Sequence, residues 1–358
     1  MSVLAALAVV MWLSCGAKAE GVPDMSAVSE ALPEEARKIS GTLTLDGSYD
    51  TAGAIERFVS GFKEAARDKL KSEIKPIMSV AGVGLICTAA LAMCPEKGFE
   101  GHINTAACAA VTLLTVDGVD SLFEQIRSAL DTASAYSHVA LPAVFTASAV
   151  SGAALSSGAR YAAVCLALDV MMSVTERLTV PLIYAFTALC VCKSILKSPI
   201  LTTCVSFVKW CAVTLMTFLT IGMSAYISLT SLLTSTADAA AIKAAKTVIS
   251  TSLPVVGGII SDASGVVLTA ASVIKASAGT FALVGVLAVC AAPFAAASVK
   301  LLVFKAASAV ASAAENTGLS GLLSDLSTAA GMLLGLLGSG AILLFISFMT
   351  AVRTVSGV

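Results

Sequence analysis

The stretch LSTAAGMLLGLLGSGAILLFISFMTAV, residues 326–352, holds 27 consecutive positions without Asp, Glu, Lys or Arg. A helix of about 20 apolar residues is enough to cross the hydrocarbon core of a bilayer. Gly331-x-x-x-Gly335 adds the spacing of small residues that lets membrane helices approach one another closely. This stretch therefore predicts a transmembrane helix with tight helix contacts.

The same composition extends over most of the chain. Hydrophobic residues make up 57% of the 358 positions and charged residues 13%, whereas soluble domains carry about 25% charge. A soluble enzyme, a nucleic-acid-binding domain and a secreted disulfide scaffold are thereby excluded. The clearest predicted spans are 77–94, 138–156, 161–174, 178–192, 210–237, 276–299 and 326–352. Weaker candidates are 103–116, 247–274 and 301–314.

We therefore expect an all-α polytopic membrane protein with seven to nine helices that cross or enter the membrane. The membrane domain should cover residues 77–358. Lys193/Lys197 and Lys300/Lys305 are the best candidates for cytoplasmic loop markers.

Residues 1–76 differ from the rest. An apolar run over 3–13 followed by Ala17-Lys18-Ala19 predicts a signal peptide, residues 1–19; an uncleaved signal anchor is the alternative. Residues 20–76 hold 19 of the 45 charges and predict a polar extracytoplasmic segment of short elements or disorder. Within it, apolar residues at helical spacing predict an amphipathic helix over 54–74. The basic residues just before the first span argue for the opposite orientation, but carboxylates interleave them.

A possible internal duplication appears when the chain is shifted by 112 positions. Leu141-Pro142 then falls on Leu253-Pro254, Pro181 on Pro293, and Lys193 on Lys305. Both predicted units, 138–235 and 250–358, run from a Leu-Pro helix start to a proline-opened helix that ends in lysine. Repeats of this kind build transport sites at their interface, although identity between the units is low and chance remains an alternative.

A few polar residues inside apolar stretches are the candidates for function. Asp262 follows Pro254 and Gly257-Gly258, and an ionised carboxylate there would be costly in lipid. We interpret these residues as a broken or re-entrant helix in which Asp262 lines a polar path, paired with Lys275. The alternative is that 247–274 lies at the membrane interface, with Asp262 in water.

Asp169 is the second such residue, with Arg160, Arg177 or Lys209 as the expected partner. His102 and His138 are expected at span edges without partners. Two membrane aspartates also raise the possibility of an intramembrane aspartyl protease, but the glycines that such enzymes place beside one aspartate are missing here.

Nothing in the sequence predicts a cofactor or a metal site. Nine of the ten cysteines lie in or beside apolar stretches, where a thiol behaves as a small hydrophobic group. Phosphate-binding loops, nucleophile elbows and zinc-binding His-Glu-x-x-His motifs are absent from the sequence.

The carboxyl-terminal part resembles a known family. The carrying residues are Lys246-Thr247-x₆-Pro254-Val255-Val256-Gly257-Gly258-Ile259-Ile260-x-Asp262, then 270–275, Ala292-Pro293, Leu141-Pro142 and Glu176-x₄-Pro181-Leu182-Ile183. This pattern is similar to the stage III sporulation protein AE family. The resemblance covers 138–358 well and the first 75 residues only in layout.

The resemblance implies a non-enzymatic subunit, a pore or scaffold, in the channel complex that connects mother cell and forespore in endospore-forming bacteria. Its location would be the mother-cell membrane surrounding the forespore. The implied partners are other stage III sporulation membrane and ring proteins and a forespore-membrane partner across the intermembrane space, with a homo-oligomer possible. The alternative function is a secondary transporter whose substrate site lies at the interface of two repeats.

Overall fold

The computed structural model describes residues 26–40, 51–93, 99–148, 154–252, 257–314 and 316–352. Every element within these ranges is a helix. In chain order they are α2 (Ser26–Glu30), α3 (Glu34–Ser40), α4 (Thr51–Met93), α5 (Phe99–Ser148), α6 (Ala154–Val174), the π-helical turn η2 (Thr175–Thr179), α7 (Val180–Leu196), α8 (Pro199–Ser252), α9 (Gly257–Ala313) and α10 (Thr317–Val352). The predicted signal peptide, residues 1–19, lies outside the described residues.

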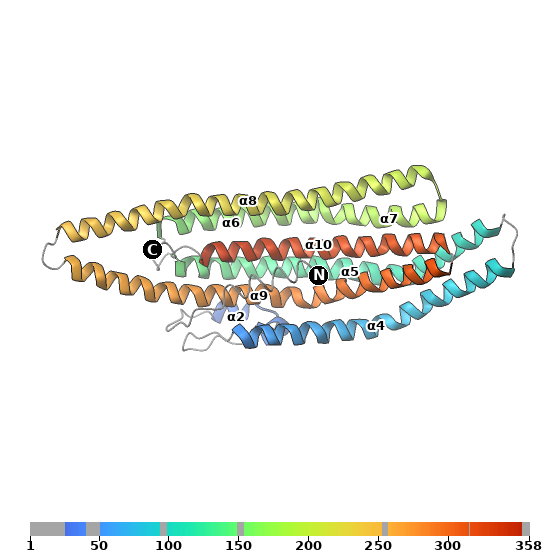
Figure 1. The fold of residues 1–358 in the computed structure, drawn as a ribbon, viewed down its shortest axis with the longest axis horizontal. Helices are drawn as coiled ribbons and strands as arrows, with labels where there is room; N and C mark the ends of the chain where they lie inside the picture. Colours follow the sequence, from blue (N-terminus) through green and yellow to red (C-terminus); the bar gives the residue numbers. More distant parts are fainter. Residues whose placement is uncertain are drawn as a thin grey trace.

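The long helices run side by side along the long axis of the molecule (Figure 1). The longest, α9, has 57 residues, which at 1.5 Å per residue correspond to about 85 Å. Six helical stretches in the described residues are long and apolar enough to cross a membrane: Gly53–Ala90, Gly101–Thr146, Arg160–Leu196, Pro199–Thr230, Gly279–Ala313 and Thr317–Thr350. The all-α, polytopic class is confirmed.

In the part of the chain that was described, six such stretches stand where the sequence predicts seven to nine helices, because neighbouring apolar segments join. The predicted spans 161–174 and 178–192 continue into one another through η2. The amphipathic segment 54–74 and the first span form one helix, α4, with Pro76 inside it. Pro142 likewise lies inside α5, so Leu141-Pro142 is not the helix start that the predicted repeat requires. The repeat itself stays a prediction.

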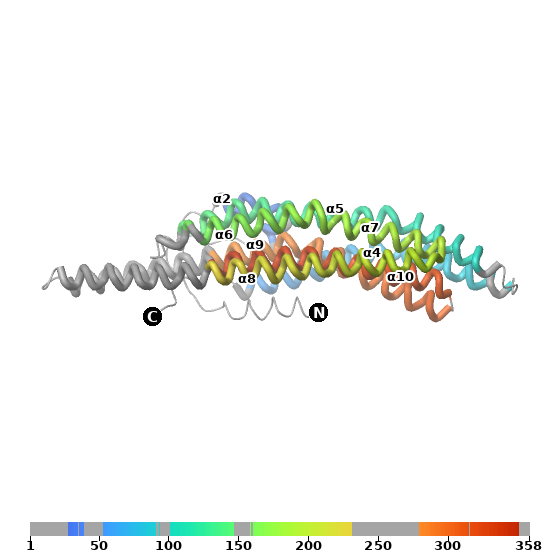
Figure 2. The backbone as a smooth tube through the Cα atoms, turned by 90° about the horizontal axis from the view of Figure 1, so that it is seen from above, coloured from blue at the N-terminus to red at the C-terminus, as the bar shows by residue number. Residues whose placement is uncertain are grey.

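The centre of the bundle is formed by α9 and α10, which pack on each other and contact α5 and α8; α9 also contacts α4. Figure 2 shows α5, α6 and α7 on one side of the molecule and α8, α9 and α10 on the other. The central position explains the composition of α9 and α10, since 83% and 72% of their most apolar windows are buried within the protein. For the other four stretches the buried share is between 17% and 39%.

Residues 26–40 of the polar amino-terminal segment pack on the bundle through two short helices. Val28, Leu32 and Ala36 are buried, and α3 packs on α4 and α9. The Arg37 guanidinium donates hydrogen bonds to the carbonyl oxygens of Ser29, Glu30 and Leu32 at 3.1–3.2 Å. These bonds close the end of α2, where backbone carbonyls lack helical partners.

Candidate functional site

A buried ion pair joins α9 to α4 near the middle of the bundle. Lys300 Nζ lies 2.9 Å from Oε1 and 2.7 Å from Oε2 of Glu73, and both side chains are less than a tenth exposed. The ammonium also lies 5.5 Å from the centre of the Phe304 ring. Gly118 on α5 makes room for it, because a β-carbon there would be 2.5 Å from Nζ. Three helices therefore meet around one neutralised charge.

The contact between Lys300 and Glu73 conflicts with the predicted placement of these two residues on opposite sides of the membrane. Lys300 was expected in a cytoplasmic loop, whereas Glu73 lies in the segment expected outside the cytoplasm. Groups in contact cannot lie on opposite sides of a membrane. Lys300 is buried in α9 rather than placed in a loop, so its use as a loop marker is wrong.

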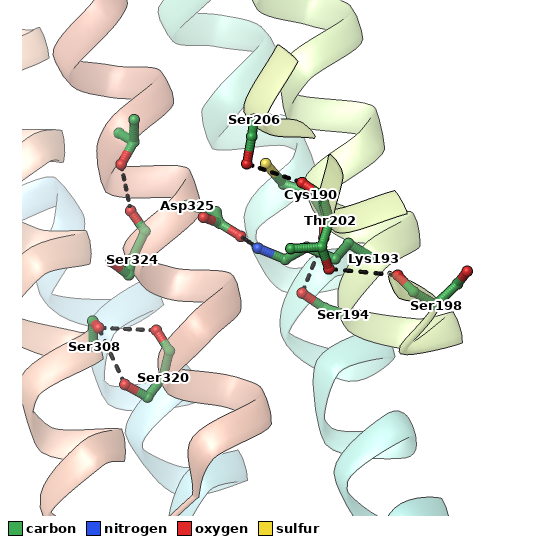
Figure 3. Close-up of polar contacts among 11 residues, drawn as sticks. Cys190, Lys193, Ser194, Ser198, Thr202, Ser206, Ser308, Ser320, Ser324 and Asp325 are labelled. Atoms are coloured by element: carbon green, nitrogen blue, oxygen red, sulfur yellow. Dashed lines mark hydrogen bonds and ion pairs between the residues drawn. The ribbon is translucent and has the colours of Figure 1, made fainter. Parts of the chain in front are cut away.

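A second ion pair links α7 to α10. Lys193 Nζ contacts Asp325 Oδ2, and both side chains are about three-quarters buried (Figure 3). The backbone of Lys197, one turn later, adopts a left-handed conformation and returns its N–H to the Lys193 carbonyl, which ends α7. Lys193 is thus an internal helix contact and not the free loop lysine that the sequence suggested.

Polar contacts also fix the turn between α9 and α10. Ser308 Oγ donates to the Ser320 carbonyl at 2.9 Å (Figure 3). Asn316 caps α10, since its Oδ1 accepts the Leu319 N–H at 3.1 Å, and its Nδ2 donates to Cys87 Sγ on α4 at 3.0 Å. An N-terminal cap of this kind satisfies a backbone donor that the helix leaves free.

A groove of about 950 Å³ lies between α3, α4 and α5, over α9. Its walls carry both charges, and its floor is formed by small residues of α9. Pro293 lines the floor together with Val289, four positions earlier. Because proline has no N–H, the Val289 carbonyl lacks its usual helical donor. The groove therefore combines carboxylates, lysines and, at the middle of α9, a backbone carbonyl without its usual helical donor.

Side chains of α7 and η2 contact α5 through polar and aromatic groups. Tyr184 Oη donates to Asp120 at 3.3 Å, and its ring stacks on Phe123 with 3.7 Å between ring centres. Glu176, in η2, faces Asp131. The Thr175 hydroxyl is buried without a hydrogen-bond partner, which is consistent with the wider turn of a π-helix at this point.

The sequence-predicted site is only partly described. Pro254 lies outside the described residues, and Gly257, Gly258, Asp262 and Lys275 lie on a stretch of α9 whose side chains are not described. The polar path and the pairing of Asp262 with Lys275 therefore stay predictions.

Asp169 lies in α6, and its Oδ1 is 3.7 Å from Nε2 of His138 on α5, with both side chains about half exposed or more. Arg160, Arg177 and Lys209 were the expected partners and His138 was expected to have none. The reason for the difference is that α5 and α6 pack against each other.

Sequence reasoning missed Glu73 and Asp325 as site residues. Each is separated from its lysine by more than a hundred positions, 227 and 132 respectively. The signal that could have found them is the lysine itself, because a charge inside an apolar helix requires a partner.

The charged and polar groups described above make contacts between helices. No cluster of three or more His, Cys, Asp or Glu that could hold a metal ion occurs in the part of the chain that the structure describes. All eight cysteines in that part are free thiols. Both lysines of the ion pairs donate to carboxylates, so the arrangement holds helices together.

Comparison with known families gives a match over most of the chain. The profile of a family described as stage III sporulation protein AE matches residues 50–355. Neither the curated proteins nor the solved structures include a significant match.

Proposed function

The chain belongs to the stage III sporulation protein AE family, and we propose that it is a non-enzymatic subunit of the channel complex that connects mother cell and forespore. It would act there as a pore or scaffold in the mother-cell membrane around the forespore, with the amino-terminal segment extracytoplasmic. Its partners would be the other stage III sporulation membrane and ring proteins and a forespore-membrane partner across the intermembrane space.

The observation that carries this proposal is the difference between two faces of the bundle. On α8, large apolar side chains are more than half exposed over 30 positions: Ile200, Phe207, Trp210, Phe218, Ile221 and Leu229. On α5, the exposed residues from Asp117 to Asp131 are all charged or polar, whereas large apolar side chains are exposed before and after this stretch, at Leu113, Leu114, Val116 and Val139.

The two faces lie at the same level of the molecule. A β-carbon on Gly335 of α10 would be 3.3 Å from Met216 on α8, and one on Gly340 would be 2.9 Å from Leu130 on α5. Near Met216 the exposed residues include Phe218, whereas Asp131 is exposed beside Leu130. An apolar face suits lipid, and a charged face at that level requires water or protein. A subunit in the wall of a membrane assembly has both.

The test is co-purification of the tagged chain from sporulating cells in mild detergent, followed by mass spectrometry. Recovery of sporulation ring and membrane proteins is expected. The comparison variant is Phe218→Lys/Ile221→Lys, which places two charges on the apolar face of α8. This variant should not insert correctly in the membrane and should therefore lose these partners. Recovery of the wild-type chain alone would contradict the proposal, and solute uptake by vesicles that contain only this chain would indicate a transporter instead.

A further inference from the structure

Two stripes of opposite charge lie on adjacent helices. The acidic stripe consists of Asp117, Asp120, Glu124 and Asp131 on α5, all exposed. Their spacing of three, four and seven positions places them on one face of a helix. Arg127 lies among them and leaves the stripe with a net negative charge.

The basic stripe consists of Lys63, Arg67, Lys71 and Lys75 on α4, all exposed. They follow one another at intervals of four positions, so each lies one turn beyond the last. The carboxylates that alternate with them in sequence, Glu64 and Asp68, line the groove, whereas none of the four cations does. Lys69 of α4 and Glu124 of the acidic stripe also line it. The α4 surface beyond the groove therefore carries these four cations, interleaved with the exposed apolar side chains of Leu70, Ile74 and Met78. Lys71 Nζ also lies 3.5 Å from Asp68.

The two stripes stand at the same height along the bundle. Lys75 lies 18 positions before Met93, where α4 ends, and Asp117 lies 18 positions after Phe99, where α5 begins. The far ends, Lys63 and Asp131, lie 30 and 32 positions from the same helix ends. Since α4 and α5 run antiparallel from a shared end (Figure 1), the stripes cover the same level. In the described residues no ion pair joins one stripe to the other.

We propose that copies of this chain associate side by side, with the acidic stripe of α5 in one copy against the basic stripe of α4 in the next. Copies inserted in one membrane share an orientation, so a ring of them keeps every residue at a constant height. Complementary surfaces must then lie at equal heights, as these two do. The contact is heterologous, with different surfaces of the two partners, and such contacts form a ring when the rotation between neighbouring copies closes. The proposal goes beyond membership of the channel complex and does not depend on it.

The test uses the full-length purified chain in nanodiscs or mild detergent, without partner proteins, and measures oligomer mass by native mass spectrometry against protein and salt concentration. The wild type should form oligomers that dissociate as salt rises, since exposed pairs are screened. The variant Asp117→Lys/Glu124→Lys/Asp131→Lys should raise the dissociation constant at least about tenfold, because several attractive pairs become repulsive. Lys63→Glu/Arg67→Glu/Lys71→Glu should do the same.

The decisive measurement is the variant that carries both sets of changes. Its stripes are exchanged in sign, so association should return, whereas a folding defect would only grow. The control Lys305→Glu reverses an exposed charge outside the stripes and should not change the mass. A wild type that stays monomeric, reversals without effect, or an exchanged variant that does not recover would each overturn the proposal. So would reversal of α4 that changes only binding to anionic vesicles, since that would make lipid the partner.

Discussion

Removal of one partner from the buried Lys300–Glu73 pair should cost far more stability than removal of both. The variant Lys300→Met leaves an uncompensated carboxylate in a site where Glu73 is 6% exposed. Loss of one member of a buried pair costs about 3–5 kcal/mol, whereas its replacement by packed apolar groups is often neutral. We expect about that loss for Lys300→Met and a smaller one for Glu73→Leu/Lys300→Met.

This loss of stability is measurable as a lower Tm in thermal unfolding in detergent. An unfolding entropy of about 2.1 cal/mol/K per residue gives about 0.75 kcal/mol/K for this chain, so a loss of 3–5 kcal/mol lowers Tm by about 4–7 °C. Lys305→Met, five positions along the same helix and exposed, is the control and should change Tm by less than about 1 °C. If the losses of Lys300→Met and Glu73→Leu simply add in the double variant, the two groups are not coupled and the reasoning fails.

Three further changes test other parts of the structure. Gly285→Ala should destabilise the protein by about 1–3 kcal/mol in thermal unfolding, because a β-carbon there would be 2.6 Å from Cζ of Tyr136; an unchanged Tm would mean that the two helices do not pack as closely as described. Asn316→Ala should cost at least about 1 kcal/mol through loss of the cap of α10, and a Tm equal to that of the wild type would contradict the cap. Ile221→Lys, at a position 65% exposed on α8, should reduce the fraction of protein recovered in membranes, since lysine at the centre of a bilayer costs about 2.5–3.5 kcal/mol. Ser128→Lys on the exposed face of α5 should have little effect, and equal recovery of both variants would refute the assignment of the two faces.

The fold class could be predicted from the sequence because charge is absent over long helical stretches. Helix boundaries could not, since proline inside a long helix looks the same in sequence as proline at its start. Pro76 and Pro142 lie within α4 and α5, where packing on neighbouring helices offsets the missing hydrogen bond. The ion pairs were hidden for a related reason, because sequence spacing says nothing about which distant helices become neighbours.

Hydropathy also cannot tell a lipid-facing helix from a helix buried in protein, because both environments favour the same side chains. The glycines of α10 resolve the ambiguity. A β-carbon on Gly331 would be 3.3 Å from Leu301 on α9, while Gly335 and Gly340 face α8 and α5. Glycines that meet three different helices place α10 inside the bundle, so the stretch that first identified a membrane protein is its core. Lipid must instead contact less apolar helices such as α8, since the two stretches with the highest mean hydropathy, in α9 and α10, are also the two most buried within the protein.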